Sequence, residues 1–397
     1  MSFEQDETGV TSTIRTRDGA EQETVRSDYL VAADGAHSRV RELAGIESAG
    51  RGSFAECVTI YFRADMRELI GNRNLSVVYV DHPNFSASSA SPSPGTPDSW
   101  PSSPRPSPTA RGTPTSPLTG TPPDAWTWSG SARPSRHPGR DRQRPAMERG
   151  SRVGGAVPGP PVFLTGDAAH VMPPTGGFGG NTGVADAHNL VWKLAAVVQG
   201  TAGAQLLDTF DAERRPVSSL TVEQAYTRYV LRVDPSLPKD DMAAPLDDAS
   251  IELGAVHRSA AVLDDCCDDG APVVHPRGPG GRPGTRAPHL AVESAGAPAS
   301  LLDSFGRGFV LLAGPAGQGW CDAAERVSAD LRVPLAAHRV AGDGSLVARK
   351  EAFPDVYGTG DEGAVVVRPG GVVAWRATTL GDPAADVDGS CAGCCLR

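Results

Sequence analysis

Lysine is scarce in this 397-residue chain, which has three lysines among 37 basic residues and a net charge of −10. This balance excludes a nucleic-acid surface, because displacing counterions from phosphates needs clustered basic side chains. No apolar run approaches the roughly 18 residues of a membrane span, and no secretory leader opens the chain. The seven cysteines form no spaced, even-numbered set, which excludes a disulfide framework. We therefore expect a soluble cytoplasmic protein with reduced thiols.

Proline is unevenly distributed, since 18 of the 35 prolines lie within residues 83–161. Ser, Pro, Thr, Arg and Gly fill this segment, which has few large apolar side chains and no period of 2 or 3.6. Such a segment cannot bury enough apolar area to offset its ordering entropy, so we expect disorder. Its lysine-free composition between two patterned flanks also fits GC-rich DNA read in a shifted frame, an origin that the tail from about residue 378 could share. A natural Pro-rich interaction segment is the alternative.

Outside this segment, apolar patterning predicts both strands and helices. Strands are expected at 10–17, 24–33, 57–63, 75–80, 162–165, 309–312, 364–368 and 372–376, with a turn at Asp18-Gly19. Helices are expected at 38–45, 182–199, 204–229 with a break near Pro216, and 321–331. In the helix at 182–199, spacings of three and four predict one buried face made of Val184, Ala187, Val191, Leu194, Ala195 and Val198.

The strongest motif is Gly-Asp-Ala-Ala-His-Val-Met-Pro-Pro-Thr-Gly-Gly-Phe-Gly-Gly-Asn-Thr-Gly at 166–183. A strand ends at Asp167, two prolines stiffen the exit, glycines allow close backbone approach, and a helix starts at Asn181 or Thr182. The carboxylate can accept hydrogen bonds from sugar hydroxyls, and a helix N-terminus favours negative charge. The motif predicts a site for a flat ligand with polar edges rather than a plain surface loop.

This motif, together with Asp-Ala-His-Asn-Leu-Val-Trp-Lys-Leu at 186–194, resembles the second flavin-binding signature of the FAD-dependent aromatic hydroxylases. These are the group A flavoprotein monooxygenases, and the resemblance is greatest to the actinomycete aromatic polyketide hydroxylases. It implies that the Gly-Asp turn holds the ribityl chain of FAD, that backbone groups meet the pyrimidine edge of the flavin, and that two prolines lie against the ring. The residues in these three roles are, in order, Gly166 and Asp167; Gly179, Gly180 and Asn181; and Pro173 and Pro174.

A second motif, at 28–41, is a strand, an Asp-Gly turn and a helix start capped by Ser38. It resembles the family's Asp-Gly motif, with Asp34, Gly35 and Arg41 in the matching places. The resemblance implies contact with the pyrophosphate side of FAD and a part in NADPH handling, whereas a plain strand–helix turn is the alternative.

The C-terminal part, 301–376, resembles the thioredoxin-like domain that polyketide hydroxylases carry. A single thiol, Cys321, stands where a thioredoxin needs Cys-x-x-Cys, which predicts a structural or dimerisation role and leaves a homodimer open. The resemblance implies an α/β (α+β) fold, with a partial FAD-binding Rossmann-like flavin hydroxylase fold and a C-terminal thioredoxin-like domain.

Family members begin with a Gly-x-Gly-x-x-Gly turn for the ADP half of FAD, and this chain starts about a hundred residues beyond it. The same spacing at 358–363 precedes a strand and is expected to be a turn. We therefore expect the chain to bind FAD weakly or not at all. The predicted division is 1–82, a remnant of the FAD-binding and substrate domains; 83–161, disordered or frame-shifted; 162–240, an FAD-binding segment; 241–300, a linker; 301–380, the thioredoxin-like domain; and 381–397, a tail.

The activity that the resemblance implies is FAD-dependent monooxygenation. NADPH reduces the flavin, and one oxygen atom of O2 passes to an electron-rich aromatic ring of a small, polyketide-type substrate. No catalytic residue can be named, and the cysteine and histidine spacings predict no metal site. The alternative is a non-catalytic remnant in which the thioredoxin-like unit acts only in folding or association.

Overall fold

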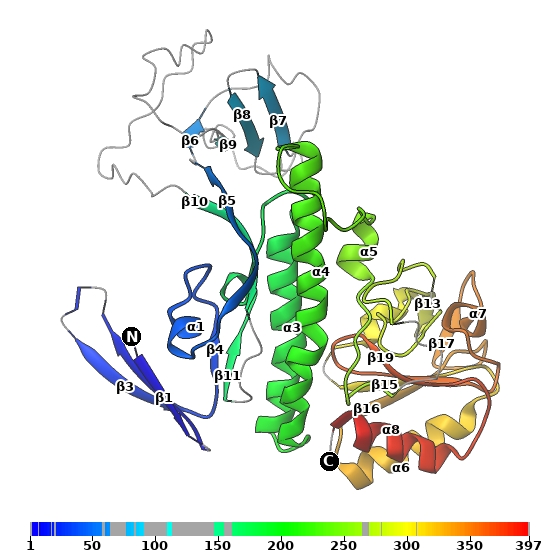
Figure 1. The fold of residues 1–397 in the computed structure, drawn as a ribbon. Helices are drawn as coiled ribbons and strands as arrows, with labels where there is room; N and C mark the ends of the chain where they lie inside the picture. Colours follow the sequence, from blue (N-terminus) through cyan, green and yellow to red (C-terminus); the bar gives the residue numbers. More distant parts are fainter. Residues whose placement is uncertain are drawn as a thin grey trace, which may run out of the picture. The chain divides into compact units, whose positions relative to one another are not determined.

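The computed structural model describes residues 2–57, 60–63, 77–82, 85–90, 109–112, 147–154 and 161–395, with gaps at 7, 17, 20, 264–269, 279 and 307. They form two units: Met1–Gly50 with Arg152–Arg397, and Arg51–Ser151. The chain passes from one unit to the other within β5 (Ser48–Cys57) and returns within β10 (Met147–Gly154) (Figure 1). Among these residues no helix is both long and apolar enough to cross a membrane.

The second unit contains an antiparallel sheet in the order β6-β9-β8-β7. Its strands are β6 (Ile60–Arg63), β7 (Val77–His82), β8 (Phe85–Ala90) and β9 (Thr109–Gly112). The prediction that 83–161 is disordered is therefore wrong at β8, β9 and β10. Ser- and Ala-rich β8 has a low intrinsic preference for strand structure, but it pairs along its whole length with β7, whose sequence favours strands. Within 83–160 the structure describes only β8, β9 and β10, so the prediction for the other residues of this range lies outside the described residues.

The first unit opens with three antiparallel strands, β1 (Ser2–Asp6), β2 (Gly9–Arg15) and β3 (Gln22–Ser27). The turn predicted at Asp18-Gly19 is confirmed, with Gly19 in the left-handed region at φ 75°. The single strand predicted at 24–33 is instead two strands, β3 and the short β4 (Leu30–Ala32), which belong to different sheets. The helix α1 (Arg39–Leu43) follows, as predicted.

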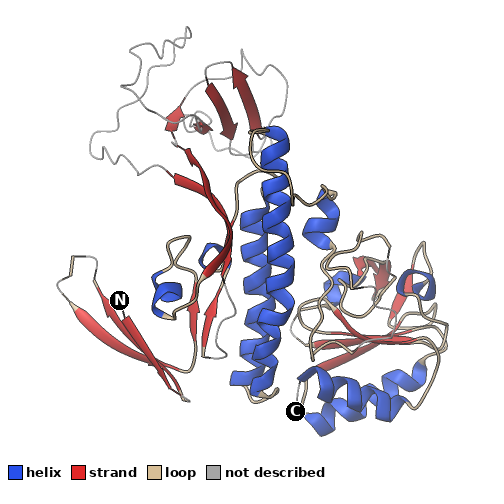
Figure 2. Cartoon of the chain, viewed as in Figure 1, coloured by secondary structure: helices blue, strands red, loops and turns tan. Residues whose placement is uncertain are grey.

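The strand β11 (Val162–Leu164) leads into the glycine-rich motif at 166–183, which begins with the 3-10 turn η1 (Gly166–Ala168) and β12 (His170–Val171). Two long helices, α3 (Phe178–Val198) and α4 (Thr209–Arg232), lie side by side, as Figure 2 shows, and the 3-10 turn η2 (Ala204–Asp208) connects them. The break predicted near Pro216 is wrong, since α4 continues through it. Burial of the helix on both sides of Pro216 outweighs the backbone hydrogen bond that proline removes. The short helix α5 (Asp248–Leu253) follows.

The face of α3 predicted to be buried is largely exposed. Val184 is 70% exposed, Val191 64% and Val198 63%. The buried positions instead include Asp186, Asn189 and Lys193, which bond to residues of α4 or its neighbours. Apolar side chains occur on both sides of this helix, and the covered side combines these polar contacts with the buried Phe178, Leu190 and Trp192.

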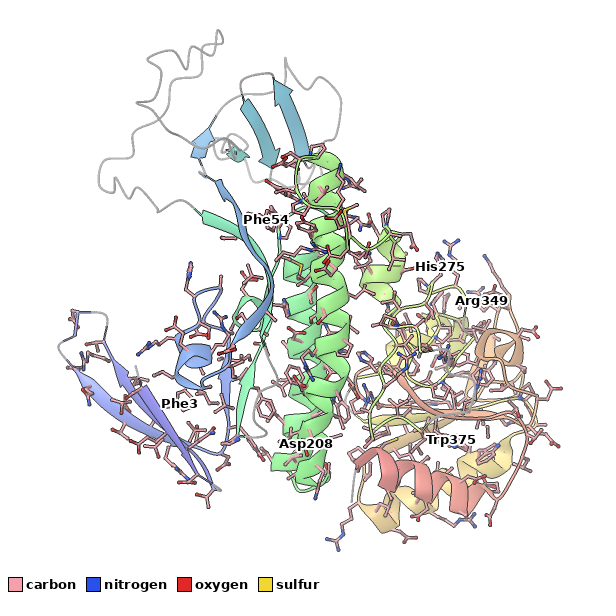
Figure 3. All side chains as sticks on the ribbon, viewed as in Figure 1. Phe3, Phe54, Asp208, His275, Arg349 and Trp375 are labelled. Carbon is pink, nitrogen blue, oxygen red and sulfur yellow. The ribbon has the colours of Figure 1, made fainter. Side chains whose placement is uncertain are left out.

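The C-terminal domain is built on a four-stranded sheet in the order β16-β15-β18-β19, with β15 and β16 parallel and the other pairs antiparallel. The helices α6 and α8 cover one face, where Trp375, labelled in Figure 3, packs on Trp320 at 5.3 Å between ring centroids. A small sheet β14-β13-β17 and helix α7 lie on the other face. The elements are β13 (Ala291–Ser294), β14 (Ala297–Ser300), η3 (Leu301–Ser304), β15 (Phe309–Ala313), α6 (Gln318–Leu331), β16 (Leu335–Arg339), β17 (Leu346–Ala348), α7 (Phe353–Tyr357), β18 (Ala364–Val367), β19 (Val373–Ala377) and α8 (Pro383–Cys395).

Two predicted boundaries of this domain are wrong. The expected linker 241–300 contains α5 and the hairpin β13–β14, whose Val292 belongs to the core of the domain. The expected tail is α8, on which Cys391 and Cys394 are fully buried. Its short alanine, glycine and cysteine side chains allow α8 to approach α6 closely. The turn predicted at 358–363 is confirmed, because Gly358 ends α7 and Gly363 precedes β18.

Candidate functional site

Parallel pairing of β4 with β11 brings the two sequence motifs together. Val162 pairs with Leu30, and Leu164 with Ala32, so both strands end at the same edge of the sheet. Thr165 extends the pairing by donating its N–H to the carbonyl of Ala32 at 2.9 Å. In open parallel sheets, ligands bind at the carboxyl ends of the strands, where the Asp-Gly and Gly-Asp turns lie here.

The Asp-Gly turn is stabilised by its own side chains. Asp34 accepts a hydrogen bond from the N–H of Val40 at 3.1 Å, and Ser38 caps α1 by accepting from the N–H of Arg41. Burial alone would raise the pKa of Asp34, but hydrogen bonds from Ser38 and from backbone N–H groups outweigh it and lower the pKa. Gly35 has φ 88°, a left-handed conformation that favours glycine. The Asp34 carboxylate therefore holds the start of α1.

Arg41 connects the two turns. Its guanidinium donates to the carbonyl of Ala36 at 3.1 Å within the first turn and to the carbonyl of Ala168 at 2.7 Å within the second. The Arg41 side chain thus fixes the spacing between the Asp-Gly and Gly-Asp motifs, a contact that spans 127 residues of sequence.

The Gly-Asp turn presents an unpaired carboxylate. Asp167 is exposed in η1, and no hydrogen bond to it occurs within the described part of the chain. Gly166, just before it, has φ 58° and packs against Gly183 of α3. The Asp167 carboxylate is therefore available to accept hydrogen bonds from hydroxyl groups of a ligand.

The Pro-Gly loop ends in two residues with left-handed backbone. Gly176 has φ 98° and Gly177 φ 75°, and a Cβ on Gly176 would lie 2.4 Å from the ring of Phe178. Pro173 is buried beneath the loop and Pro174 is exposed on it. Glycine thus allows the left-handed conformation at both positions, and the buried Phe178 ring leaves no room for a side chain at Gly176.

The helix α3 begins at Phe178 with Gly177 as its N-cap, earlier than the predicted start at Asn181 or Thr182. Gly177 can adopt the left-handed conformation that turns the loop directly into the helix. No side chain caps this end, so the first N–H groups, including those of Gly179 and Gly180, point out of the helix without an intrahelical partner. Asn181 lies in the first turn and donates its side-chain N–H to Glu252 at 2.9 Å. The result is a positive helix end beside Asp167 and the prolines.

Sequence reasoning missed a cluster of buried charges that joins α3 and α4 to the C-terminal domain. Glu213 of α4 accepts from both Arg368 guanidinium nitrogens at 2.7 and 2.6 Å, and from Lys193 at 2.9 Å. Asn189 and Ser259 donate to the same carboxylate at 2.7 and 2.6 Å. The side chains of Glu213, Lys193 and Arg368 are 0% exposed. The cluster therefore fixes the C-terminal domain on the helix pair.

The cluster perturbs the pKa values of Glu213 and Lys193, and burial beside it lowers the pKa of His257 to about 3. Burial alone would raise the pKa of Glu213, but the charges of Arg368 and Lys193 outweigh it and hold the pKa well below its ordinary value. Burial lowers the pKa of Lys193 to about 7, although Glu213 opposes this shift. Lys193 and Arg368 therefore share the Glu213 carboxylate in a site closed to water, and Lys193 loses its proton at a much lower pH than an exposed lysine.

Two protein-family models match the chain. One, described as an FAD binding domain, matches residues 1–225, and the other, described as aromatic-ring hydroxylase, C-terminal, matches residues 280–391. The chain belongs to the FAD-dependent aromatic-ring hydroxylases. The hydroxylase family and the flavin cofactor predicted from the motifs at 28–41 and 166–194 are thereby confirmed.

Individual relatives agree with the family models. The hydroxylase is 43% identical to 4-methyl-5-nitrocatechol 5-monooxygenase of Burkholderia sp over 398 residues, which cover 96% of this chain and 70% of the relative. It is 36% identical to tetracenomycin A2 monooxygenase-dioxygenase of Streptomyces glaucescens, covering 97% and 68% of the two chains. A crystal structure of aklavinone-11 hydroxylase in a ternary complex with FAD and aklavinone matches with a TM-score of 0.87 at 36% identity, covering 100% of this chain and 73% of that one. The hydroxylase is an FAD-dependent monooxygenase, and a purely non-catalytic module is not favoured.

The residues at the site fit the flavin half of FAD. A Cβ on Gly35, Gly177 or Gly180 would meet nothing within 4 Å, so the backbone faces open space at each position. The unpaired carboxylate of Asp167 suits hydroxyl groups, and the uncapped helix end suits a partly negative ring edge. These are the groups that a ribityl chain and an isoalloxazine ring require.

Proposed function

We propose that the hydroxylase uses NADPH and O2 to hydroxylate an electron-rich aromatic substrate of the polyketide type. The name of the nitrocatechol monooxygenase supports an aromatic substrate. The polyketide type is supported by the relatives named for tetracenomycin A2 and for polyketide hydroxylation, and by the aklavinone-11 hydroxylase, which was crystallised with aklavinone. When bound, FAD supplies hydride acceptance and O2 activation. The protein contributes binding, orientation and electrostatics.

Each site residue has a part in this proposal. Asp167, placed by Gly166, accepts hydrogen bonds from ribityl hydroxyls. The first-turn backbone groups of α3, at Gly179, Gly180 and Asn181, donate to the pyrimidine edge of the flavin, where reduction places negative charge. The remaining residues hold the cofactor from either side: Pro173 and Pro174 against the ring, and Asp34, Gly35 and Arg41 near the pyrophosphate.

The domain organisation is part of the same proposal. Residues 1–82 and 162–240 contribute to the FAD-binding part, and the C-terminal domain has a thioredoxin-like fold. Its sheet order β16-β15-β18-β19, with one parallel pair and two helices on one face, supports that assignment. We assign the domain a role in structure or in homodimer formation rather than in thiol chemistry, because burial raises the pKa of Cys321.

The observation that carries the proposal is the convergence of three features at one sheet edge: the Asp-Gly turn, the free carboxylate of Asp167 and the uncapped start of α3. The test is titration of purified protein with FAD, followed by flavin absorbance and fluorescence. We expect saturable binding, and NADPH oxidation that increases when a polycyclic phenol is added.

A pair of variants makes this test specific. Asp167→Ala is expected to weaken FAD binding about tenfold or more, the value of a hydrogen bond to a charged group. Asp208→Ala is the matched control, because Asp208 is also exposed but lies at the far end of the helix pair, as Figure 3 shows. Equal FAD dissociation constants for the two variants would contradict the proposed site.

A further inference from the structure

A buried carboxylate lies directly beneath the flavin-binding turn. Asp186 of α3 is 2% exposed and accepts hydrogen bonds from three different elements. His170 of β12 is 2.7 Å away through Nε2, Arg214 of α4 donates its Nε–H at 2.9 Å, and Gly166 of η1 donates its backbone N–H at 3.0 Å. One side chain therefore joins the loop, both long helices and the turn.

The hydrogen bond from the Gly166 N–H to Asp186 holds the residue immediately before Asp167, whose backbone conformation determines where the Asp167 side chain points. Gly166 is in the left-handed region, and a Cβ on Gly183 would lie 3.2 Å from the Gly166 Cα. The turn thus rests on the backbone of α3, where no side chain separates the two. Asp186, one helical turn after this contact, tethers the amide of Gly166 and prevents the turn from lifting away from the helix.

The partners of Asp186 keep its carboxylate ionised and in place. Burial alone would raise the pKa of Asp186, but the hydrogen bond from His170 and the charge of Arg214 outweigh it and lower the pKa. The side chain of Arg214 is 7% exposed, so water screens this ion pair little. Nδ1 of His170 is buried and has no partner among the described residues, so the bond from Nε2 to Asp186 orients the ring.

We propose that Asp186, held by His170 and Arg214, is a positioning residue that fixes the Gly166 amide and so aims Asp167 at the ribityl chain of FAD. This role rests on the proposed function of Asp167. Asp186 itself touches no cofactor atom, and its effect on FAD passes through the turn. Its loss should loosen the turn in the protein without cofactor as well as weaken cofactor binding.

The experiment compares two conservative variants of buried carboxylates. Asp186→Asn keeps the shape of the side chain but removes its charge. Glu213→Gln is the matched control, because Glu213 is equally buried and precedes Arg214 on α4, yet its contacts lead to the C-terminal domain. Both proteins are examined below their unfolding temperatures, after circular dichroism has shown that they are folded.

Two measurements follow on each protein. Hydrogen–deuterium exchange of peptides covering 163–170 reports the turn in the absence of FAD, and fluorescence titration gives the FAD dissociation constant. Asp186→Asn is expected to speed exchange in these peptides and to raise the dissociation constant by about ten- to a hundredfold, the range expected for losing a hydrogen bond to a charged group. The visible circular dichroism of the bound flavin should also change. Glu213→Gln lowers the stability of the whole fold, but its contacts lead to the C-terminal domain, so in the folded protein it should leave the exchange of these peptides, the FAD dissociation constant and the flavin circular dichroism as in the parent.

The outcomes separate this role from the proposed function. Unchanged exchange and FAD affinity in Asp186→Asn, with Asp167→Ala still weakening FAD, would overturn the role of Asp186 and leave the flavin site standing. Equal effects of Asp186→Asn and Glu213→Gln would also overturn it, because general destabilisation would then explain both. An Asp167→Ala protein that binds FAD like the parent would refute the proposed function and with it the positioning role of Asp186. If Asp186→Asn does not fold, Arg214→Lys takes its place, because it keeps the charge but loses the Nε hydrogen bond to Asp186. This variant must then show faster exchange and weaker FAD binding, both to a smaller extent.

Discussion

Replacing Glu213 by glutamine should be among the most destabilising single changes in the hydroxylase. The substitution leaves Lys193 and Arg368 buried without their shared anion, and it weakens hydrogen bonds of 2.6–2.9 Å. Removing one partner of a buried ion pair costs about 3–5 kcal/mol, because the remaining charge stays out of water. We expect a loss of that size in the free energy of unfolding.

The same geometry predicts a contrasting result for Lys193→Met. This change removes one of the two cations and leaves Glu213 with the bidentate Arg368 contact. Because Arg368 still neutralises Glu213, the change leaves no buried charge uncompensated, so the expected loss is below about 2 kcal/mol. Urea unfolding near pH 6.5, followed by circular dichroism, measures both variants. A loss below about 1 kcal/mol for Glu213→Gln, or equal losses for both, would refute the reasoning.

The pH dependence of stability should carry the signature of Lys193. Its pKa in the folded protein is about 7, below the ordinary 10.5, so the folded protein releases this proton first as the pH rises. Between these two values the unfolded chain holds more protons, and this group makes the free energy of unfolding rise with pH. Below pH 7 both the folded and the unfolded protein hold this proton, so the unfavourable contribution of the buried charged lysine to stability no longer changes with pH. The rise should be absent from Lys193→Met when the two proteins are compared over the same pH series.

Three further changes test local features. Gly176→Ala should destabilise the flavin loop by about 1–3 kcal/mol, since alanine must take a strained conformation and clash with a buried ring, whereas Gly180→Ala has open space and should change stability by less than about 1 kcal/mol in thermal unfolding. Ser38→Ala should cost about 1 kcal/mol through the lost helix cap, measured by urea unfolding, and no loss would contradict the cap. Burial raises the pKa of Cys391 to about 12 and also raises that of Cys394, so a thiol reagent should modify them only after denaturant is added; rapid labelling of the native protein would contradict their burial.

Local chemistry explains what could be predicted from the sequence. The Asp18-Gly19 turn, the capping of α1 by Ser38 and the glycine loop before α3 each depend on a few neighbouring residues, and all three are present in the structure. The two flavin motifs are far apart in sequence, but each is complete within its own segment. Their meeting at the ends of β4 and β11 follows from parallel pairing.

The predictions that were wrong depend on contacts between residues that are far apart in the sequence. The buried face of α3 is set by Glu213 and Arg214, which lie 20 and 28 residues from their partners Lys193 and Asp186. Arg368 reaches Glu213 across 155 residues, a distance that no local pattern encodes. A signal was nevertheless present, because Asp186, Asn189 and Lys193 recur at spacings of three and four on one side of α3. The uninterrupted course of α4 and the packing of α8 likewise depend on tertiary contacts that outweigh local propensity.

The proposed flavin site consists of the two turns and the start of α3. A crystal structure of the protein grown with saturating FAD would show whether the cofactor occupies it. We expect the flavin ring with its pyrimidine edge within hydrogen-bond distance of the first-turn amides of α3, and the ribityl chain bonded to Asp167. Flavin bound elsewhere, or a ribityl chain that makes no contact with Asp167, would contradict it.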